Sequence, residues 1–398
     1  MTHAALPRLS RRALGKLGLG AALVATGSGR AFAQAPDIVI GAASPLTGVF
    51  AFAGVEGFEG SRDYFEWTNR QGGVAGRKIK FMAEDSGYRV DNAVAIFTRL
   101  TSQNSIPIFL GDSTGFQKAI NPELNRRGTT VMAGASFATE IDDPAAFPNQ
   151  WIPGPNYSDQ LRVLLRYIQA QKRGASVVLV NSDTEFGRDP IAAAEAEAKR
   201  LGLNVVEKII TQPGSVDISA DVLKIRRRNP DYVVFHGYVL QPIPEFMAQA
   251  RQAGMTSKFM GTFYSTDTVL MGRAGAAADG YLGVSCYNLE PNAQGAQMAL
   301  VREFNGTRVR TNAYFQGWTN AMIAVETLKR ALGASQELNA VNLMKAARSI
   351  QNLDTGGIVG VPVSVVRNSL PVGRIYEFKA SEKRLVAASD WMTIAPNT

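Results

Sequence analysis

The chain has 398 residues, 45% of them hydrophobic and 19% charged, which excludes a disordered chain and a membrane-embedded protein. The length allows one large core or two ordinary ones. The net charge of +8 would suggest a nucleic-acid-binding protein. Five of the 42 basic residues, however, lie in the first 33 positions, and the rest of the chain has 37 basic and 34 acidic residues. We therefore expect no nucleic-acid partner.

Residues 1–33 predict an export signal. The stretch SRRALGK carries Arg11 and Arg12, and an apolar run from Leu17 to Thr26 follows that is too short to span a membrane. The sequence AFA ending at Ala33 is the small-x-small pattern that signal peptidase cleaves. The arginine pair and the glycine-rich run favour twin-arginine export. We therefore expect a soluble periplasmic chain that begins near Gln34.

Strands and helices alternate along the next 220 or so residues. Strands are predicted at 37–42, 79–83, 106–110 and 130–133, with helices at 57–71, 90–104 and 116–127. After residue 154 the alternation restarts, with helices at 157–171, 189–201, 219–228 and 243–253 and strands at 176–180, 205–210, 232–236 and 259–261. This alternation predicts an α/β fold of two Rossmann-like lobes with parallel central sheets covered on both faces.

Further helices are predicted at 293–304, 315–332 and 339–349, and a β-rich tail from residue 358. These helices exceed what a second lobe needs, so we expect the chain to return to the first lobe and then cross again. The proline-rich segment FPNQWIPGP would be the first crossing. The predicted boundaries are 34–152 plus 286–360 for lobe 1 and 153–285 plus 361–398 for lobe 2.

The sequence offers little for catalysis or for a metal site. His236 is the only histidine beyond the leader, and no HxxxH, CxxC, GxSxG or GxxxxGK[ST] motif occurs. Cys286 lies among small and apolar residues and is predicted to be a buried structural thiol. We expect no catalytic residue, no metal and no cofactor.

Small polar residues follow two of the predicted strands, in the segments DSTG (112–115) and GASF (134–137). In open α/β sheets, ligands bind beyond the carboxyl ends of the strands. Free N–H groups at a helix start, with hydroxyls beside them, suit a carboxylate. Plain helix capping by Asp112, Ser113 or Thr114 is an equally good interpretation from the residues alone.

From about Asp37 to Trp391 the chain resembles the periplasmic solute-binding proteins of ABC transporters, in the Leu/Ile/Val-binding branch with the type I periplasmic binding fold. The segments that carry the resemblance are IVIGAASPLTG, GFEGSRDYFEWTNRQGGVAGRKIKFMAEDSGYRVDNAV, LGDSTGF, DTEFGRDP, DISADVLKIRRRNPDYVVFHGY, FMAQARQAGM, AAADGYLGVS and NAMIAVETLKRALGAS. The resemblance implies two lobes joined by three crossing segments, closure on a small molecule, and an inner-membrane ABC permease with its ATPase as partner.

The resemblance also implies a ligand site. The loops Ser113-Thr114-Gly115 and Ala135-Ser136-Phe137 would hold the ligand carboxylate. Aromatic positions of the family would fall at Phe52 and Phe186, and a third region at His236 and Tyr238. Amino-acid binders carry an acidic residue where this chain has Phe263 and Tyr264, with Asp267 a few residues further on.

An ammonium group without an acidic partner in a closed cleft costs several kcal/mol, whereas aromatic walls favour a flat ligand. We therefore expect a receptor for an aromatic carboxylate and not an enzyme. The alternative is a branched-chain or other amino acid, with Asp267 as the ammonium partner. A ligand sensor of the same fold and an exported enzyme are the remaining alternatives.

Overall fold

Residues 36–290 and 292–394 are described by the structure, a computed structural model. The predicted export signal, residues 1–33, lies outside these residues. Within the described part, no helix has both the length and the apolar character that crossing a membrane requires.

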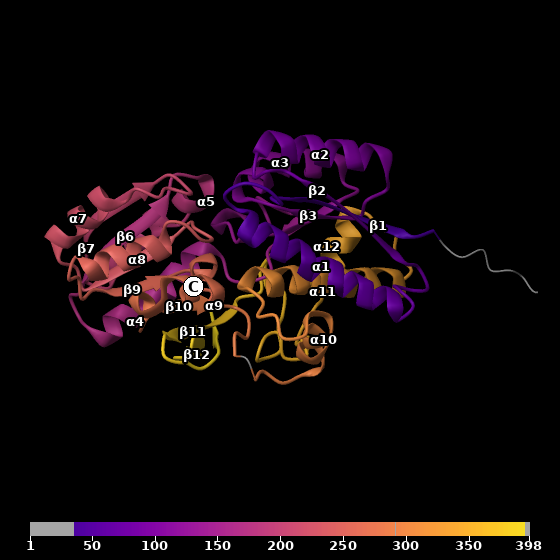
Figure 1. The fold of residues 1–398 in the computed structure, drawn as a ribbon. Coiled ribbons are helices and arrows are strands. Elements are labelled where there is room, and N and C mark those ends of the chain that lie inside the picture. The colour runs from indigo at the N-terminus through magenta and orange to yellow at the C-terminus, as the bar shows by residue number, and fades with distance from the viewer. Residues whose placement is uncertain (1–35, 291, 395–398) are drawn as a thin grey trace, which may run out of the picture. The chain divides into compact units, whose positions relative to one another are not determined.

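The first lobe is built on a five-stranded parallel sheet (Figure 1). In spatial order its strands are β2 (Ile79–Asp85), β1 (Ile38–Ser44), β3 (Ile108–Gly111), β4 (Val131–Gly134) and β5 (Gln150–Trp151). The helices between them are α1 (Ala51–Arg70), α2 (Val90–Gln103) and α3 (Thr114–Arg127), and a 3-10 helix η1 (Thr139–Asp142) follows β4. Every residue of β3 and β4 is buried, as expected for strands covered on both faces.

The second lobe is built on a larger sheet. In spatial order its strands are β12 (Arg384–Ala387), β11 (Val372–Lys379), β10 (Leu282–Ser285), β9 (Lys258–Gly261), β8 (Tyr232–His236), β6 (Ser176–Ser182) and β7 (Asn204–Thr211), while β13 (Met392–Thr393) pairs with β11. Its helices are α4 (Tyr157–Gln171), α5 (Glu185–Arg188), α6 (Ile191–Arg200), α7 (Ser219–Arg228), α8 (Ile243–Gln252) and α9 (Thr268–Ala274), with the 3-10 helices η2 (Phe263–Ser265) and η3 (Gly275–Ala278).

The prediction that both sheets are parallel is correct for the first and wrong for part of the second. The strands β6 to β10 pair in parallel, but β11 runs antiparallel to β10 and β12 antiparallel to β11. β11 and β12 are consecutive in the chain and joined by a short turn, which is a connection that only antiparallel strands can use.

The element order shows three crossings between the lobes, after β5, after β10 and before β11. Between the second and third crossings lie α10 (Ala296–Asn305), α11 (Asn312–Gly333) and α12 (Ala340–Arg348). α11 lies along α1, and Figure 1 shows these two helices on the opposite side of the first sheet from α2 and α3. The late helices therefore complete the first lobe. The residue boundaries of the lobes stay a prediction.

Glycines allow α1 and α11 to approach closely. A methyl group on Gly60 would lie 2.1 Å from the carbonyl oxygen of Tyr314, and one on Gly317 would lie 1.9 Å from that of Gly57. Both distances are far below van der Waals contact, and the opposing atoms are backbone, which cannot move without displacing a helix. The spacing of the two helices therefore depends on the absence of side chains at these positions.

We expect Gly317→Ala to lower the free energy of unfolding by about 1–3 kcal/mol, because the added methyl group overpacks this contact. Gly333→Ala is the matched control: it lies at the end of the same helix, with no atom within 4 Å of the added methyl. Because alanine has a higher helix propensity than glycine, Gly333→Ala should leave the free energy of unfolding unchanged or raise it by up to about 1 kcal/mol. Urea unfolding measures both; equal effects would show that α1 and α11 do not depend on the glycine contact.

Candidate ligand-binding site

A cavity lies at the carboxyl ends of β1, β3 and β4, where elements of the second lobe face the first. The space inside it, including the part open to solvent, is about 700 Å³. The first lobe contributes the ends of three strands and one face each of α1 and α11, and the second lobe contributes Tyr157, Phe186, Val239 and Tyr264.

One end of the cavity is polar and lies at the start of α3. Ser113 caps this helix, its hydroxyl oxygen accepting the N–H of Phe116 at 3.2 Å. Thr114 and Gly115 follow in the first turn, where backbone N–H groups have no partner within a helix. The hydroxyl of Thr114 is buried and has no hydrogen-bond partner among the described residues. This end therefore presents donors to whatever enters the cavity.

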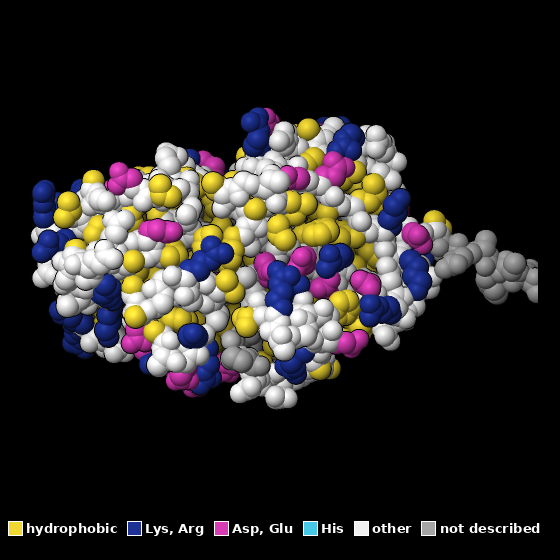
Figure 2. All heavy atoms as spheres, in the orientation of Figure 1, with side chains coloured by type: hydrophobic (Ala, Val, Ile, Leu, Met, Phe, Trp, Pro, Cys, Tyr) yellow, Lys and Arg dark blue, Asp and Glu magenta, His cyan; other side chains and the backbone are white. Residues whose placement is uncertain are grey.

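The remaining walls are largely aromatic. Phe50 stacks on Tyr88 with ring centroids 3.9 Å apart, and Phe186 contacts Tyr157 at 4.9 Å and Tyr264 at 5.4 Å. All five rings line the cavity. At its outer side Phe58 of α1 stacks on Phe81 of β2 at 5.7 Å. Figure 2 shows hydrophobic side chains gathered at the surface between α1 and β2.

The structure brings six of the twelve residues predicted from the sequence to the cavity wall: Ser113, Thr114, Ala135, Ser136, Phe186 and Tyr264. The other six lie outside the lining: Phe52, Gly115, Phe137, His236, Tyr238 and Phe263. Phe137 and Phe263 contact each other's rings at 4.8 Å and pack against Tyr264 from behind. The ring of Phe52 lies 5.5 Å from the Arg273 guanidinium, and Tyr238 bonds Thr211 at 2.7 Å.

Several lining residues were not predicted: Phe50, Tyr88, Asp112, Tyr157, Gln316 and Asn320. Phe50 lies two residues before the predicted Phe52, at the cap of α1. Asp112 begins the DSTG segment that the prediction had already singled out. For Gln316 and Asn320, which lie about 200 residues after Asp112, the sequence holds no local signal.

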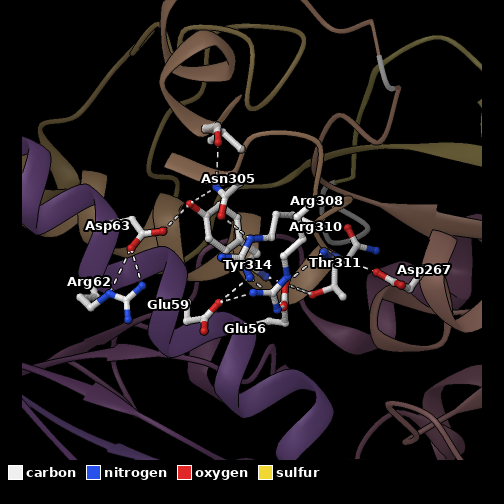
Figure 3. Close-up of polar contacts among 12 residues, drawn as sticks. Glu56, Glu59, Arg62, Asp63, Asp267, Asn305, Arg308, Arg310, Thr311 and Tyr314 are labelled. Atoms are coloured by element: carbon white, nitrogen blue, oxygen red, sulfur yellow. Dashed lines mark hydrogen bonds and ion pairs between the residues drawn. The ribbon is translucent and has the colours of Figure 1, made fainter. Parts of the chain in front are cut away.

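Asp267 does not line the cavity. Its carboxylate caps α9, accepting the N–H groups of Val269 at 2.8 Å and Leu270 at 3.2 Å, and it accepts the N–H of Asn312 from the first lobe at 2.8 Å (Figure 3). Burial raises the pKa of this carboxyl to about 6, although the three hydrogen bonds from backbone N–H groups act to lower it. Because both oxygens are occupied by backbone groups, Asp267 holds two lobes together and is not available to a ligand ammonium.

The family described as "Periplasmic binding protein" matches residues 37–372. The chain belongs to the periplasmic binding proteins. The members of this family are exported solute-binding proteins that are associated with transport, and they are not enzymes.

Three proteins similar to this chain differ in the ligands that their names give. The protein is 26% identical over 252 residues to the Leu/Ile/Val-binding protein of Escherichia coli K12, covering 63% of this chain and 68% of that protein. A branched-chain amino acid ABC transporter structure from Thermus thermophilus with bound valine is similar, with TM-score 0.83, 25% identity and coverage of 90% and 97% of the two chains. A solute-binding protein from R. palustris in complex with benzoate shares the fold, with TM-score 0.77, 18% identity and the same two coverages.

In this periplasmic binding protein His236 lies directly behind the cavity wall. Its Nε2 lies 2.9 Å from the carbonyl oxygen of Phe186 and its Nδ1 lies 2.8 Å from the hydroxyl of Thr262. A carbonyl only accepts, so Nε2 carries the hydrogen and Nδ1 accepts from Thr262. Burial lowers the pKa of His236 to about 3, although the bond to Phe186 opposes this. A neutral histidine therefore fixes the backbone of Phe186 and does not touch the cavity.

The pH dependence of stability tests this state. Between pH 6.5 and about 3 the unfolded chain holds a proton on His236 that the folded protein does not, so acidification destabilises the fold by up to about 1.4 kcal/mol per pH unit. We expect His236→Gln to lose stability less steeply than the wild type between pH 6 and pH 4.5. Urea unfolding at several pH values measures the two slopes. Parallel curves would show that folded His236 carries a proton.

Several hydrogen bonds join the lobes of the binding protein around the cavity. The hydroxyl of Tyr264 in η2 bonds the carbonyl oxygen of Ala135 and lies 2.6 Å from Oε1 of Gln316 in α11. The Asp189 carboxylate accepts the N–H of Thr139 at 3.0 Å and its hydroxyl at 2.5 Å. Lys118 of α3 lies 3.6 Å from the same carboxylate. These contacts hold second-lobe groups against the first lobe on more than one side of the cavity.

Proposed function

We propose that this protein is the extracytoplasmic receptor of an ABC importer and that it captures a small aromatic carboxylate in the cavity between its lobes. The observation that carries the proposal is the placement of a helix start and a set of aromatic rings around one cavity. Membership of the periplasmic binding proteins supports the transport role.

The start of α3 is suited to the ligand carboxylate. The helix has 14 residues, and its first-turn N–H groups carry partial positive charge that favours an anion. The unpartnered hydroxyl of Thr114 is a further donor at the same place. The loop at Ala135 and Ser136 is less available than predicted, because the N–H of Ser136 already donates to Oε1 of Gln117 at 3.1 Å.

The aromatic walls are suited to a flat apolar ligand body. Phe50, Tyr88, Tyr157, Phe186 and Tyr264 all contribute to the lining, and each ring contact adds about 0.5–1.5 kcal/mol beyond the burial of apolar area. These features favour a phenyl or phenyl-alkyl acid.

The proposal includes closure of the lobes on the ligand about the three crossing segments. We propose the lobe boundaries 34–152 plus 286–360 and 153–285 plus 361–398, with residues 1–33 as a twin-arginine export signal and the periplasm as the site of action. An inner-membrane ABC permease with its ATPase would then take up the ligand from the closed receptor. The bonds of Tyr264 and Asp189 across the lobes are the contacts that closure would make.

A branched-chain or other amino acid is the second candidate ligand. The names of the Escherichia coli and Thermus thermophilus relatives favour it. It requires an acidic partner for the ammonium group, and Asp267 is occupied by backbone N–H groups. Asp112 is the only Asp or Glu among the described residues that line the cavity.

A thermal-shift screen of the chain from residue 34 distinguishes the two candidates. The compounds are benzoate, phenylacetate, 3-phenylpropanoate, leucine, isoleucine and valine. A ligand at 100 times its dissociation constant stabilises the fold by about 2.7 kcal/mol, enough for a shift of several degrees. We expect shifts with the aromatic acids alone. A shift with the amino acids alone would overturn the proposed ligand class.

Small-angle X-ray scattering tests closure separately. We expect the radius of gyration to fall when the stabilising acid is added. An unchanged radius of gyration at saturating ligand would contradict closure, whatever the ligand.

A further inference from the structure

Three residues that line the same cavity each carry a buried polar atom with no hydrogen-bond partner among the described residues. These atoms are Oδ1 of Asp112, the hydroxyl of Thr114 and Oδ1 of Asn320. The three side chains are between 0% and 8% exposed. Because an unpaired buried polar group is costly, their common location indicates that a ligand completes these bonds.

Asp112 is the charged group of this set. It stands directly after β3 and before the cap of α3, so it lies beside the donors proposed to hold the ligand carboxylate. Its Oδ2 bonds the hydroxyl of Ser86, while Oδ1 has no hydrogen-bond partner among the described residues. No Lys, Arg or His is found among the described residues that line the cavity. A ligand carboxylate would thus meet a second carboxyl group and no cation.

The other titratable groups around Asp112 do not supply a compensating charge. Tyr88, before α2, Tyr157 of α4 and Tyr264 of η2 line the same cavity, and burial raises the pKa of each phenol, so they stay neutral. On α3 itself, Lys118 lies 3.3 Å from Glu140 and 3.6 Å from Asp189, and it does not line the cavity.

Two anions cannot share this space, so one of them must carry a proton. We propose that Asp112 takes up one proton from solvent when the ligand carboxylate binds, and that its Oδ1–H then donates a hydrogen bond to the ligand anion. Burial raises the pKa of Asp112 to about 6 even without ligand, although the hydroxyls of Ser86 and Ser113 partly offset this. This inference rests on the proposed carboxylate ligand and explains how a cavity without a cation could hold it.

Proton uptake has a measurable consequence for affinity. Above pH 6 the free protein is increasingly ionised at Asp112, and each ligand must bring one proton with it. The dissociation constant should therefore rise about tenfold from pH 7 to pH 8. Asp112→Asn replaces the acid by an amide whose N–H₂ donates at every pH. We expect its affinity to vary less than twofold over this range.

The experiment is isothermal titration calorimetry with benzoate, phenylacetate and 3-phenylpropanoate at pH 8, in two buffers that differ in ionisation enthalpy. We expect about one proton to be taken up per ligand in the wild type and in the control Asp231→Asn, whose carboxylate pairs with Lys172 in the second lobe. We expect no uptake in Asp112→Asn. The wild-type measurement stands even if the Asp112 variant fails to fold.

The outcomes separate the two proposals. Binding of the acids without proton uptake and with a constant dissociation constant would overturn the role of Asp112 and leave the proposed function intact. If the protein binds benzylamine but none of the acids, and Asp112→Asn abolishes that binding, Asp112 is part of a cation site. This result would overturn both the proton uptake by Asp112 and the proposed function. Absence of binding by all three acids would also overturn both.

Discussion

Replacing Glu56 by alanine is expected to lower the free energy of unfolding by about 3 kcal/mol. The Glu56 carboxylate is 9% exposed and accepts Nη1 of Arg310, itself 5% exposed, at 2.8 Å. It also accepts from Arg308 and from both donors of Thr311, so it ties α1 to the segment before α11 (Figure 3). Breaking a buried ion pair costs about 3–5 kcal/mol, and we expect the lower end because Glu59 still pairs with Arg310.

The matched control is Glu66→Ala on the same helix. Glu66 pairs with Arg70 at 2.5 Å, but both side chains are about half exposed, at 50% and 54%. Exposed pairs of this spacing contribute about 0.3–0.5 kcal/mol. Guanidinium unfolding of both variants gives the comparison. A loss for Glu56→Ala as small as that of the control would show that the segment before α11 is held by other contacts.

Tyr264→Phe is expected to weaken ligand binding by about 10- to 100-fold, or about 1.4–2.7 kcal/mol. The phenol is the second-lobe group that bonds Ala135 and Gln316 of the first lobe. Removing its oxygen leaves the ring in the cavity wall but removes the bond between the lobes, while the Ala135 carbonyl oxygen keeps the bond from Nε2 of Gln316 at 2.6 Å. Because these bonds join the lobes, their loss should act on closure and hence on affinity.

Tyr281→Phe is the control for this variant. The Tyr281 hydroxyl donates to the carbonyl oxygen of Ser265 at 2.5 Å, and both residues belong to the second lobe. It should lower thermal stability while changing affinity less than twofold. Isothermal titration calorimetry with the aromatic acid that binds most tightly measures the affinity of both variants, and thermal unfolding measures their stability. Equal losses of affinity would indicate that Tyr264 acts through the stability of its own lobe and not through closure.

The alternation of strands and helices could be predicted from the sequence because each element has its own periodicity. Where prediction failed, a longer-range contact decided the outcome. α1 begins at Ala51 rather than at the predicted Gly57. Its first turns pack against Pro45, where a methyl group on Gly54 would lie 2.1 Å from the Pro45 carbonyl oxygen. The predicted helix 189–201 is present as α6, which begins at Ile191 after Pro190, and the short helix α5 before it was not predicted.

The polar end of the cavity could be predicted for a physical reason. The segment DSTG follows a buried strand and begins a helix, and that local pattern determines where its N–H groups lie. The aromatic walls could be predicted only in part, since Phe186 and Tyr264 came from the family resemblance. Tyr88 and Tyr157 reach the cavity from the loop before α2 and from the start of α4, and only the folded chain brings them beside Phe186.

The most direct test of the account is a crystal structure of the exported chain grown with the aromatic acid that raises its melting temperature most. We expect the carboxylate oxygens about 3 Å from the N–H and the hydroxyl of Thr114, with Asp112 beside them and the ring of the ligand against Tyr157 and Phe186. A ligand bound outside this cavity, or one whose carboxylate points toward Phe58 and Phe81, would contradict the account.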